Sequence, residues 1–164
     1  MNRIILSAIV FLIAISVNSQ TKFEAIFQNH MVLQRNTQVH IWGVDKPNTK
    51  VVVSGSWGVE RLVKTDKNGK WKTTLKTVGA GGPYNVVVKG SKKVVLEDVL
   101  LGEVWICTGQ SNMAMPLKGG PGQHIEGSNT AILNSSNSSL RFVTVDRATS
   151  RTPLENMKGA WHVS

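Results

Sequence analysis

Short segments that alternate apolar and polar residues, separated by turn signals, run from Phe23 to about Asp98. Alternation gives a strand one apolar and one polar face, and strands repeating at intervals of roughly 8–12 residues are typical of an antiparallel β-sandwich. Turn residues join the segments, including Pro47 and Asn48 in DKPNT and Gly69 in DKNG. The predicted strands are QVHIWG, KVVVSG, GVERLVKT, KWKTTLKT, YNVVVKG and KKVVLEDVLLG. No helical periodicity interrupts them, so residues 21–100 are predicted to be an all-β domain.

The pattern changes at Gly102. The segment EVWIC (103–107) is a continuous apolar run after one acid, which is typical of a strand buried on both faces of a parallel sheet. GQSNM then predicts a turn, residues 129–138 a short helix, and LRFVTVD a further strand. Strand, turn, helix and strand make the first unit of an α/β domain, and about 60 residues are too few to complete one. The predicted fold class is therefore mixed: a β-sandwich followed by the first β/α unit of an incomplete α/β domain at residues 101–164.

Residues 1–20 are predicted to be a signal peptide. Arg3 supplies a positive N-terminal region, and the apolar run from Ile4 to Val17 is too short for a comfortable membrane span. Small and polar residues follow it in a usable cleavage pattern. A secreted or periplasmic protein is expected, with a retained N-terminal anchor as the alternative.

The chain is basic, with 19 Lys and Arg against 10 Asp and Glu and a formal net charge of +9. Its lysines alternate with apolar residues along the predicted strands, as on the solvent-facing side of a half-exposed sheet. No helical basic stripe or row of stacking aromatic residues accompanies them, so no nucleic-acid partner is expected. No membrane contact is expected beyond the leader. These lysines are Lys64, Lys67, Lys70, Lys72 and Lys76.

Cys107 is the only cysteine, which excludes a disulfide within the chain. Its place inside EVWIC predicts a buried strand residue, and Ile106 beside it is predicted to be buried as well. A thiol nucleophile would need a histidine partner and positive surroundings.

Ser111 follows the predicted strand 103–107. Open α/β sheets bind ligands just outside the carboxyl ends of their strands, so a serine at this place is well positioned for chemistry. Gly109 allows a tight turn, from which the Ser111 hydroxyl can project while its N–H faces the space where an oxyanion forms. The Gly-x-Ser-x-Gly pattern of a nucleophile elbow is not met, because position 113 is Met. From the residues alone, Ser111 is either a turn serine or a nucleophile.

Several longer segments resemble one known family in order and spacing. They are NHMVLQR, IWG, NGKWKTTL, AGGPYNVVVKG, EDVLLGEVWICTGQSNMAMP and LRFVTV. Between about Ala25 and His162 the chain thus resembles bacterial sialate O-acetylesterases, secreted carbohydrate esterases of the SGNH (GDSL-like) hydrolase superfamily. The resemblance implies a flavodoxin-like α/β domain beginning at residue 101. It also implies an O-acetylated sugar of the sialic acid or xylan type as substrate, and neither cofactor nor metal ion.

The resemblance further implies roles for the residues around the turn. Ser111 falls on the family's nucleophile, and its backbone N–H becomes one oxyanion donor. Gly109, Gln110 and Asn112 form the surrounding turn, with Gln110 and Asn112 as candidate substrate-binding residues. His124 lies in the glycine-rich loop beyond and is a candidate for lining the substrate cleft, since loops at strand ends carry specificity.

Other parts of the family's machinery cannot be assigned in this sequence. The superfamily needs a Gly and an Asn from later blocks for its oxyanion hole, and an Asp-x-x-His pair to activate the serine. His162 does not match, because position 159 is Gly, and it is predicted to lie in a loop. His30 and His40 are predicted to be a turn residue and a strand-surface residue. A serine hydroxyl without an adjacent base is a weak nucleophile, so the chain is expected to be an N-terminal fragment that is catalytically silent or nearly so.

Two functions without catalysis stay open: a secreted β-sandwich module that binds carbohydrate or another partner, and a gene fragment with no function of its own. The five tryptophans are spread one per predicted strand or turn, and each is predicted to pack in the core or against a sheet. Trp57, in the turn GSWG, is the best candidate for an exposed ring on which a sugar could stack.

Overall fold

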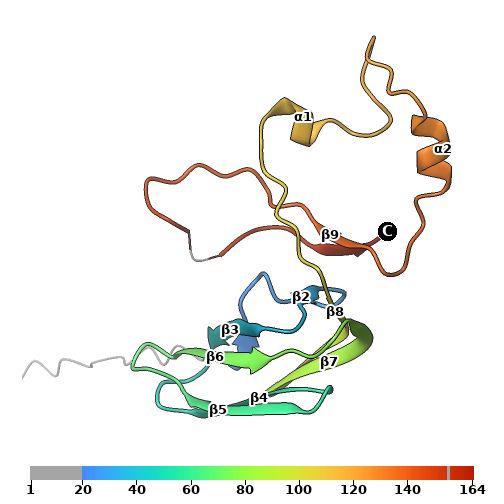
Figure 1. Cartoon of the computed structure of the whole chain (residues 1–164). Coiled ribbons are helices and arrows are strands. Elements are labelled where there is room, and N and C mark those ends of the chain that lie inside the picture. The colour runs from blue at the N-terminus through green and yellow to red at the C-terminus, as the bar shows by residue number, and fades with distance from the viewer. Residues whose placement is uncertain (1–19, 155) are drawn as a thin grey trace, which may run out of the picture.

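The computed structural model describes residues 20–154 and 156–164. Nearly all of the predicted signal peptide lies outside these residues. Strands dominate the described chain, and its two helices are short (Figure 1). The strands are β1 (Lys22–Phe23), β2 (Val32–Gln34), β3 (Gln38–Val44), β4 (Lys50–Gly55), β5 (Val59–Lys64), β6 (Lys70–Lys76), β7 (Gly81–Lys89), β8 (Lys93–Gly102), β9 (Arg141–Val143) and β10 (Trp161–Val163), and the helices are α1 (Ser111–Ala114) and α2 (Ser128–Leu133).

Two sheets form the lower layers in Figure 1. One has the strand order β2-β8-β7-β4-β5 and the other the order β1-β3-β6. All neighbouring pairs in them are antiparallel except β2 and β8, which run parallel. The mostly β architecture agrees with the alternating sequence pattern, and β3 to β8 lie where strands were predicted. The parallel strand β2 was not predicted.

A single apolar core lies between the two sheets. Strict alternation places Val51 and Val53 of β4 and Val86 and Val88 of β7 inward, and each is 0% exposed. Burying side chains of this size stabilises the fold by about 1.5–3 kcal/mol each. The other buried apolar residues are Phe23, Phe27, Met31, Leu33, Ile41, Trp71, Leu75, Leu96, Val99 and Leu101.

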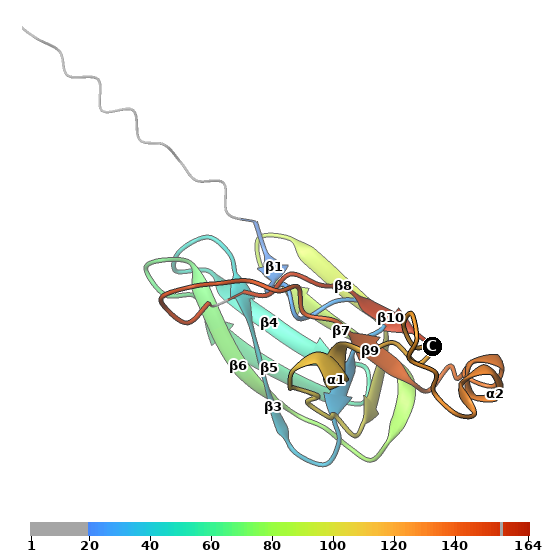
Figure 2. The ribbon, with the colours of Figure 1, turned by 90° about the horizontal axis from the view of Figure 1, so that it is seen from above.

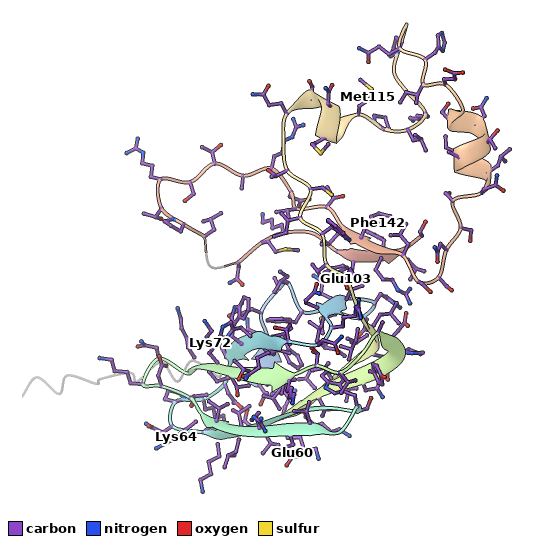
Figure 3. All side chains as sticks on the ribbon, viewed as in Figure 1. Glu60, Lys64, Lys72, Glu103, Met115 and Phe142 are labelled. Atoms are coloured by element: carbon purple, nitrogen blue, oxygen red, sulfur yellow. The ribbon has the colours of Figure 1, made fainter. Side chains whose placement is uncertain are left out.

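The outer faces of the sheets carry the charge. In Figure 3 the side chains of Glu60 and Lys64 project from β5 away from the core, and Lys72 projects from β6. All five lysines that the sequence predicted to face solvent are exposed. Their exposure follows from the same alternation that buries Trp71 and Leu75.

Strand β8 contains a bulge. Its pairing with β7 runs from Leu96 opposite Val86 to Val99 opposite Tyr84, so β8 has one residue more than its partner over this stretch. Asp98 in the bulge has a φ of 54°, in the left-handed region. An extra residue restores inward orientation to both Leu96 and Val99 and turns the Asp98 side chain to the sheet edge.

The prediction for residues 103–107 was wrong. This segment belongs to no helix or strand, and Trp105 and Ile106 are 84% and 89% exposed. Cys107 is exposed as well. A strand buried on both faces needs hydrogen-bonding neighbours and covering side chains, and no strand in the described part of the chain lies beside this one.

The segments after residue 103 form an open arch above the layers (Figure 1). Helix α2 lies where a short helix was predicted, whereas the strand predicted over LRFVTVD is limited to β9. β9 pairs with β10, so His162 lies in a strand opposite Phe142 and not in a loop as predicted. Seen from above in Figure 2, the chain between β9 and β10 crosses over the layers. Among the described residues, no helix is long and apolar enough to cross a membrane.

Candidate functional site

Ser111 is the first residue of helix α1, which stands away from the sheets at the far end of residues 103–110 (Figure 1). Its side chain is exposed, as are those of Gln110 and Asn112. The Met113 N–H donates to the Gln110 carbonyl over 3.0 Å, which closes the turn that presents Ser111. The sequence expected this turn at the carboxyl end of a strand; the structure places it after an extended segment that is not part of a sheet.

Gly109 is needed for space. A Cβ at this position would lie 2.6 Å from the Cγ of Met113. Gly109 does not have a positive φ, so its role is to admit the Met113 side chain. The sequence analysis attributed the glycine to a tight turn, and the structure assigns it to this close approach.

No nucleophile–base pair is assembled among the described residues. The Ser111 hydroxyl has no hydrogen bond to any histidine that the structure describes. His124 is exposed in its loop, next to a tight turn at residues 120–123 that is closed by backbone hydrogen bonds between Gly120 and Gln123. His30 Nδ1 lies 2.6 Å from an Asp98 carboxylate oxygen, and the His162 ring packs against Phe142 at 5.6 Å.

The segment that leads to Ser111 is held at its root by residues that the sequence analysis left without a role. Glu103 accepts a hydrogen bond from the Gln34 amide at 2.8 Å and one from Arg35 Nε at 2.6 Å. The Val104 N–H donates to the Gln34 side-chain oxygen at 2.8 Å. The Gln34 hydrogen bond and then Arg35 hold the pKa of Glu103 below its ordinary value. The segment MVLQR was the only sequence signal for this contact.

The largest cavity described lies elsewhere, between the β1–β3 edge and the chain that joins β9 to β10. It has a volume of about 620 Å³, and Ser111 does not line it. Its lining combines the Trp42 ring with charged and apolar side chains. The lining residues are Glu24, Ile26, Trp42, Val145, Asp146, Arg147, Ala148, Leu154, Asn156, Met157 and Lys158.

Trp57 is not an open platform for sugars. It is half-buried, its Nε1 donates to the Lys76 carbonyl at 2.9 Å, and its ring packs edge-on against Tyr84. The most exposed tryptophan is Trp105. Within the described ranges, no group of three or more His, Cys, Asp or Glu side chains is arranged to hold a metal ion.

Comparison with known proteins bears on this serine. Over 83% of its length the chain is 31% identical to human sialate O-acetylesterase, and over 57% it is 34% identical to the mouse sialate O-acetylesterase. Its structure matches the crystal structure of XAC1771, a carbohydrate acetylesterase from Xanthomonas citri, with a TM-score of 0.79 and 31% identity over 87% of this chain. The chain is similar to carbohydrate O-acetylesterases. No family model matches it.

The chain spans only part of these esterases: 27% of the human protein, 19% of the mouse protein and 32% of XAC1771. A continuous match that covers 83% of 164 residues includes residue 111 wherever it begins. Ser111 and the turn around it therefore lie in the part of the chain that is similar to these esterases.

Proposed function

We propose that this chain carries the N-terminal layers and the nucleophile segment of a secreted carbohydrate O-acetylesterase. The observation that carries the proposal is the 31% identity to a sialate O-acetylesterase across a stretch that contains Ser111. The structural similarity to a carbohydrate acetylesterase supports the same class of activity. An acetyl ester of a sugar, of the sialic acid or xylan type, is the proposed substrate.

In the proposed reaction the Ser111 hydroxyl oxygen attacks the acetyl carbonyl carbon, and a histidine base takes the hydroxyl proton. The resulting tetrahedral oxyanion accepts a hydrogen bond from the Ser111 backbone N–H. Collapse of the intermediate expels the sugar alcohol, which receives the proton, and leaves an acetyl group on the serine. Water then releases acetate by the same steps. Gln110 and Asn112, exposed on either side of Ser111, are proposed to contact the sugar, and His124 to border its cleft.

We propose further that residues 20–164 by themselves hydrolyse esters only near the background rate. No described histidine contacts Ser111, and a serine hydroxyl without a base is a weak nucleophile at neutral pH. Serine hydrolases stripped of triad residues retain roughly 10³–10⁴-fold catalysis over water from the oxyanion hole and binding. With one oxyanion donor proposed here, we expect less than that.

The test measures acetate release from an O-acetylated sialic acid and from an activated acetyl ester by purified residues 20–164. The same measurement is made on Ser111→Ala, with Ser128→Ala as the control because it changes a serine at the start of the other short helix. We expect all three proteins to lie within about tenfold of one another. Turnover of about 1 s⁻¹ or more that is lost only in Ser111→Ala would contradict the proposed silence, and serine-independent turnover would contradict the proposed nucleophile.

A further inference from the structure

The segment MVLQR forms the edge strand β2 and the residue after it. Val32, Leu33 and Gln34 pair in parallel with Leu100, Leu101 and Gly102 of β8. The Arg35 N–H adds a hydrogen bond of 3.0 Å to the Gly102 carbonyl. Both strands end here, and β8 continues directly into the segment that leads to Ser111.

Beyond this point the Gln34 side chain takes over from the backbone. Its oxygen accepts the Val104 N–H at 2.8 Å, as a strand carbonyl would, and its nitrogen donates to Glu103 Oε2 at 2.8 Å. Arg35 Nε donates to the other carboxylate oxygen, Oε1, at 2.6 Å. Both carboxylate oxygens and the next backbone N–H are thus satisfied by two consecutive residues of β2 and its end.

Magnitudes separate direction from stability in this contact. The Arg35 and Glu103 side chains are 41% and 50% exposed, and exposed pairs contribute little to the free energy of unfolding. Hydrogen bonds to a charged group have defined geometry, however, and three of them on adjacent residues define an orientation. In Figure 3 Glu103 lies where the chain leaves the layers, whereas Met115, just beyond helix α1, is far from it.

The distance to Ser111 makes that orientation matter. Residues 103–111 span at most roughly 28 Å when extended, so a change of 10° at the root displaces the far end by up to roughly 5 Å. A misplacement of about 1 Å is enough to cost a reaction two orders of magnitude.

We propose that Gln34 and Arg35 are positioning residues that set the direction in which residues 103–110 leave the sheets, and thereby the place of Ser111. The importance of that place for catalysis rests on the proposed function. The direction of the segment does not, and it can be measured without any ester.

The experiment uses Cys107 as a probe, because it is exposed and is the only cysteine in the chain. A nitroxide attached to Cys107 broadens the amide signals of nearby residues, so the pattern of broadening over β2 and β8 reports the direction of the segment. Amide hydrogen exchange at Val104 reports its hydrogen bond to Gln34. Gln34→Met keeps the length of the side chain and removes both polar contacts. Gln38→Met makes the same change at an exposed position of β3 and serves as the control.

We expect Gln34→Met to raise the exchange rate of the Val104 amide about tenfold and to blur the broadening pattern, while exchange in β3, β4 and β7 stays within about twofold. Gln38→Met is expected to change neither. Arg35→Glu and Glu103→Arg are each expected to blur the pattern, and the double variant, which restores opposite charges, to recover it.

An unchanged broadening pattern in Gln34→Met would overturn the proposal. So would a rise in exchange throughout the core strands, since that would give Gln34 a general role in stability. A failure of ester hydrolysis in the assay above would overturn the proposed function and leave these two outcomes readable.

Discussion

At the scale of single residues, Asp45 is the most constrained polar group described. It is 0% exposed and accepts hydrogen bonds from Thr21 Oγ1, the Ser91 hydroxyl and the N–H groups of Lys46 and Ser91. Gly90 makes room for the carboxylate, because a Cβ there would lie 2.0 Å from Asp45 Oδ2. Burial alone would raise the pKa of Asp45. The hydrogen bonds from Ser91, Thr21 and Lys46 outweigh it and hold the pKa below its ordinary value of 3.8.

We expect Asp45→Asn to lower the free energy of unfolding at pH 7 by about 1–3 kcal/mol, because an amide nitrogen would face donors. A lowered pKa in the folded state means that the unfolded chain binds the proton more readily. The contribution of Asp45 is therefore complete above pH 4 and is lost as the pH falls below 3.8 through the lower folded value. The difference between wild type and variant in urea unfolding should shrink over that range. Asp146→Asn removes the same charge at an exposed position and should show neither effect.

At the scale of elements, the bulge in β8 connects the layers to the β9–β10 pair. Asp98 in the bulge contacts His30 at 2.6 Å and Arg141 Nη2 of β9 at 3.0 Å. The Arg141 side chain is only 5% exposed, so Asp98 supplies the opposite charge to a nearly buried cation. Gln28 adds contacts to β10, since its amide oxygen accepts the Trp161 N–H at 3.2 Å.

We expect Asp98→Asn to loosen β9 and β10 while leaving the sheets below intact. Asparagine tolerates the left-handed backbone of this position, so the substitution tests the charge alone. Removing the partner of a nearly buried cation should cost about 1–3 kcal/mol locally, seen as faster amide exchange in β9 with little change in β3 and β4. Glu97→Gln, the neighbouring exposed acid in the bulge, is the control. Equal exchange in the two variants would show that the Asp98 charge does not hold β9.

At the scale of the whole molecule, the apolar side chains divide into two groups. Those of the two sheets are buried in one core, whereas many in the arch that follows residue 103 are exposed. The most exposed are Trp105, Ile106 and Leu133, at 84%, 89% and 83%. Apolar surface of this kind is removed from water by association.

We expect residues 20–164 to self-associate at micromolar concentrations, with a sedimentation coefficient that rises with concentration. The double variant Trp105→Ser, Ile106→Ser should reduce this association without lowering the unfolding temperature, because neither side chain contributes to the core. Leu62→Ser removes an exposed apolar residue from β5 and should leave association largely unchanged. A wild-type protein that stays monomeric across the concentration range would refute the expectation.

The sequence predicted those features that depend on neighbours along the chain. Alternation with a period of two placed β3 to β8 and the exposed lysines, since each residue's face follows from its position in its own strand. The turn that presents Ser111 was predicted in the same way. Whether Ser111 acts as a nucleophile stays a prediction.

Only the tertiary structure decided contacts between residues that are remote in sequence. Asp45 looks like an ordinary turn residue, yet its partners Thr21 and Ser91 lie 24 and 46 positions away and make it a buried anion. Gln34 meets Glu103 across 69 positions, through a parallel pairing that no local pattern announces. The run at 103–107 shows the limit most clearly. Apolar residues specify that a strand can be buried, but burial itself requires a neighbour, and hydrogen-bond partners and covering side chains are properties of the assembled fold.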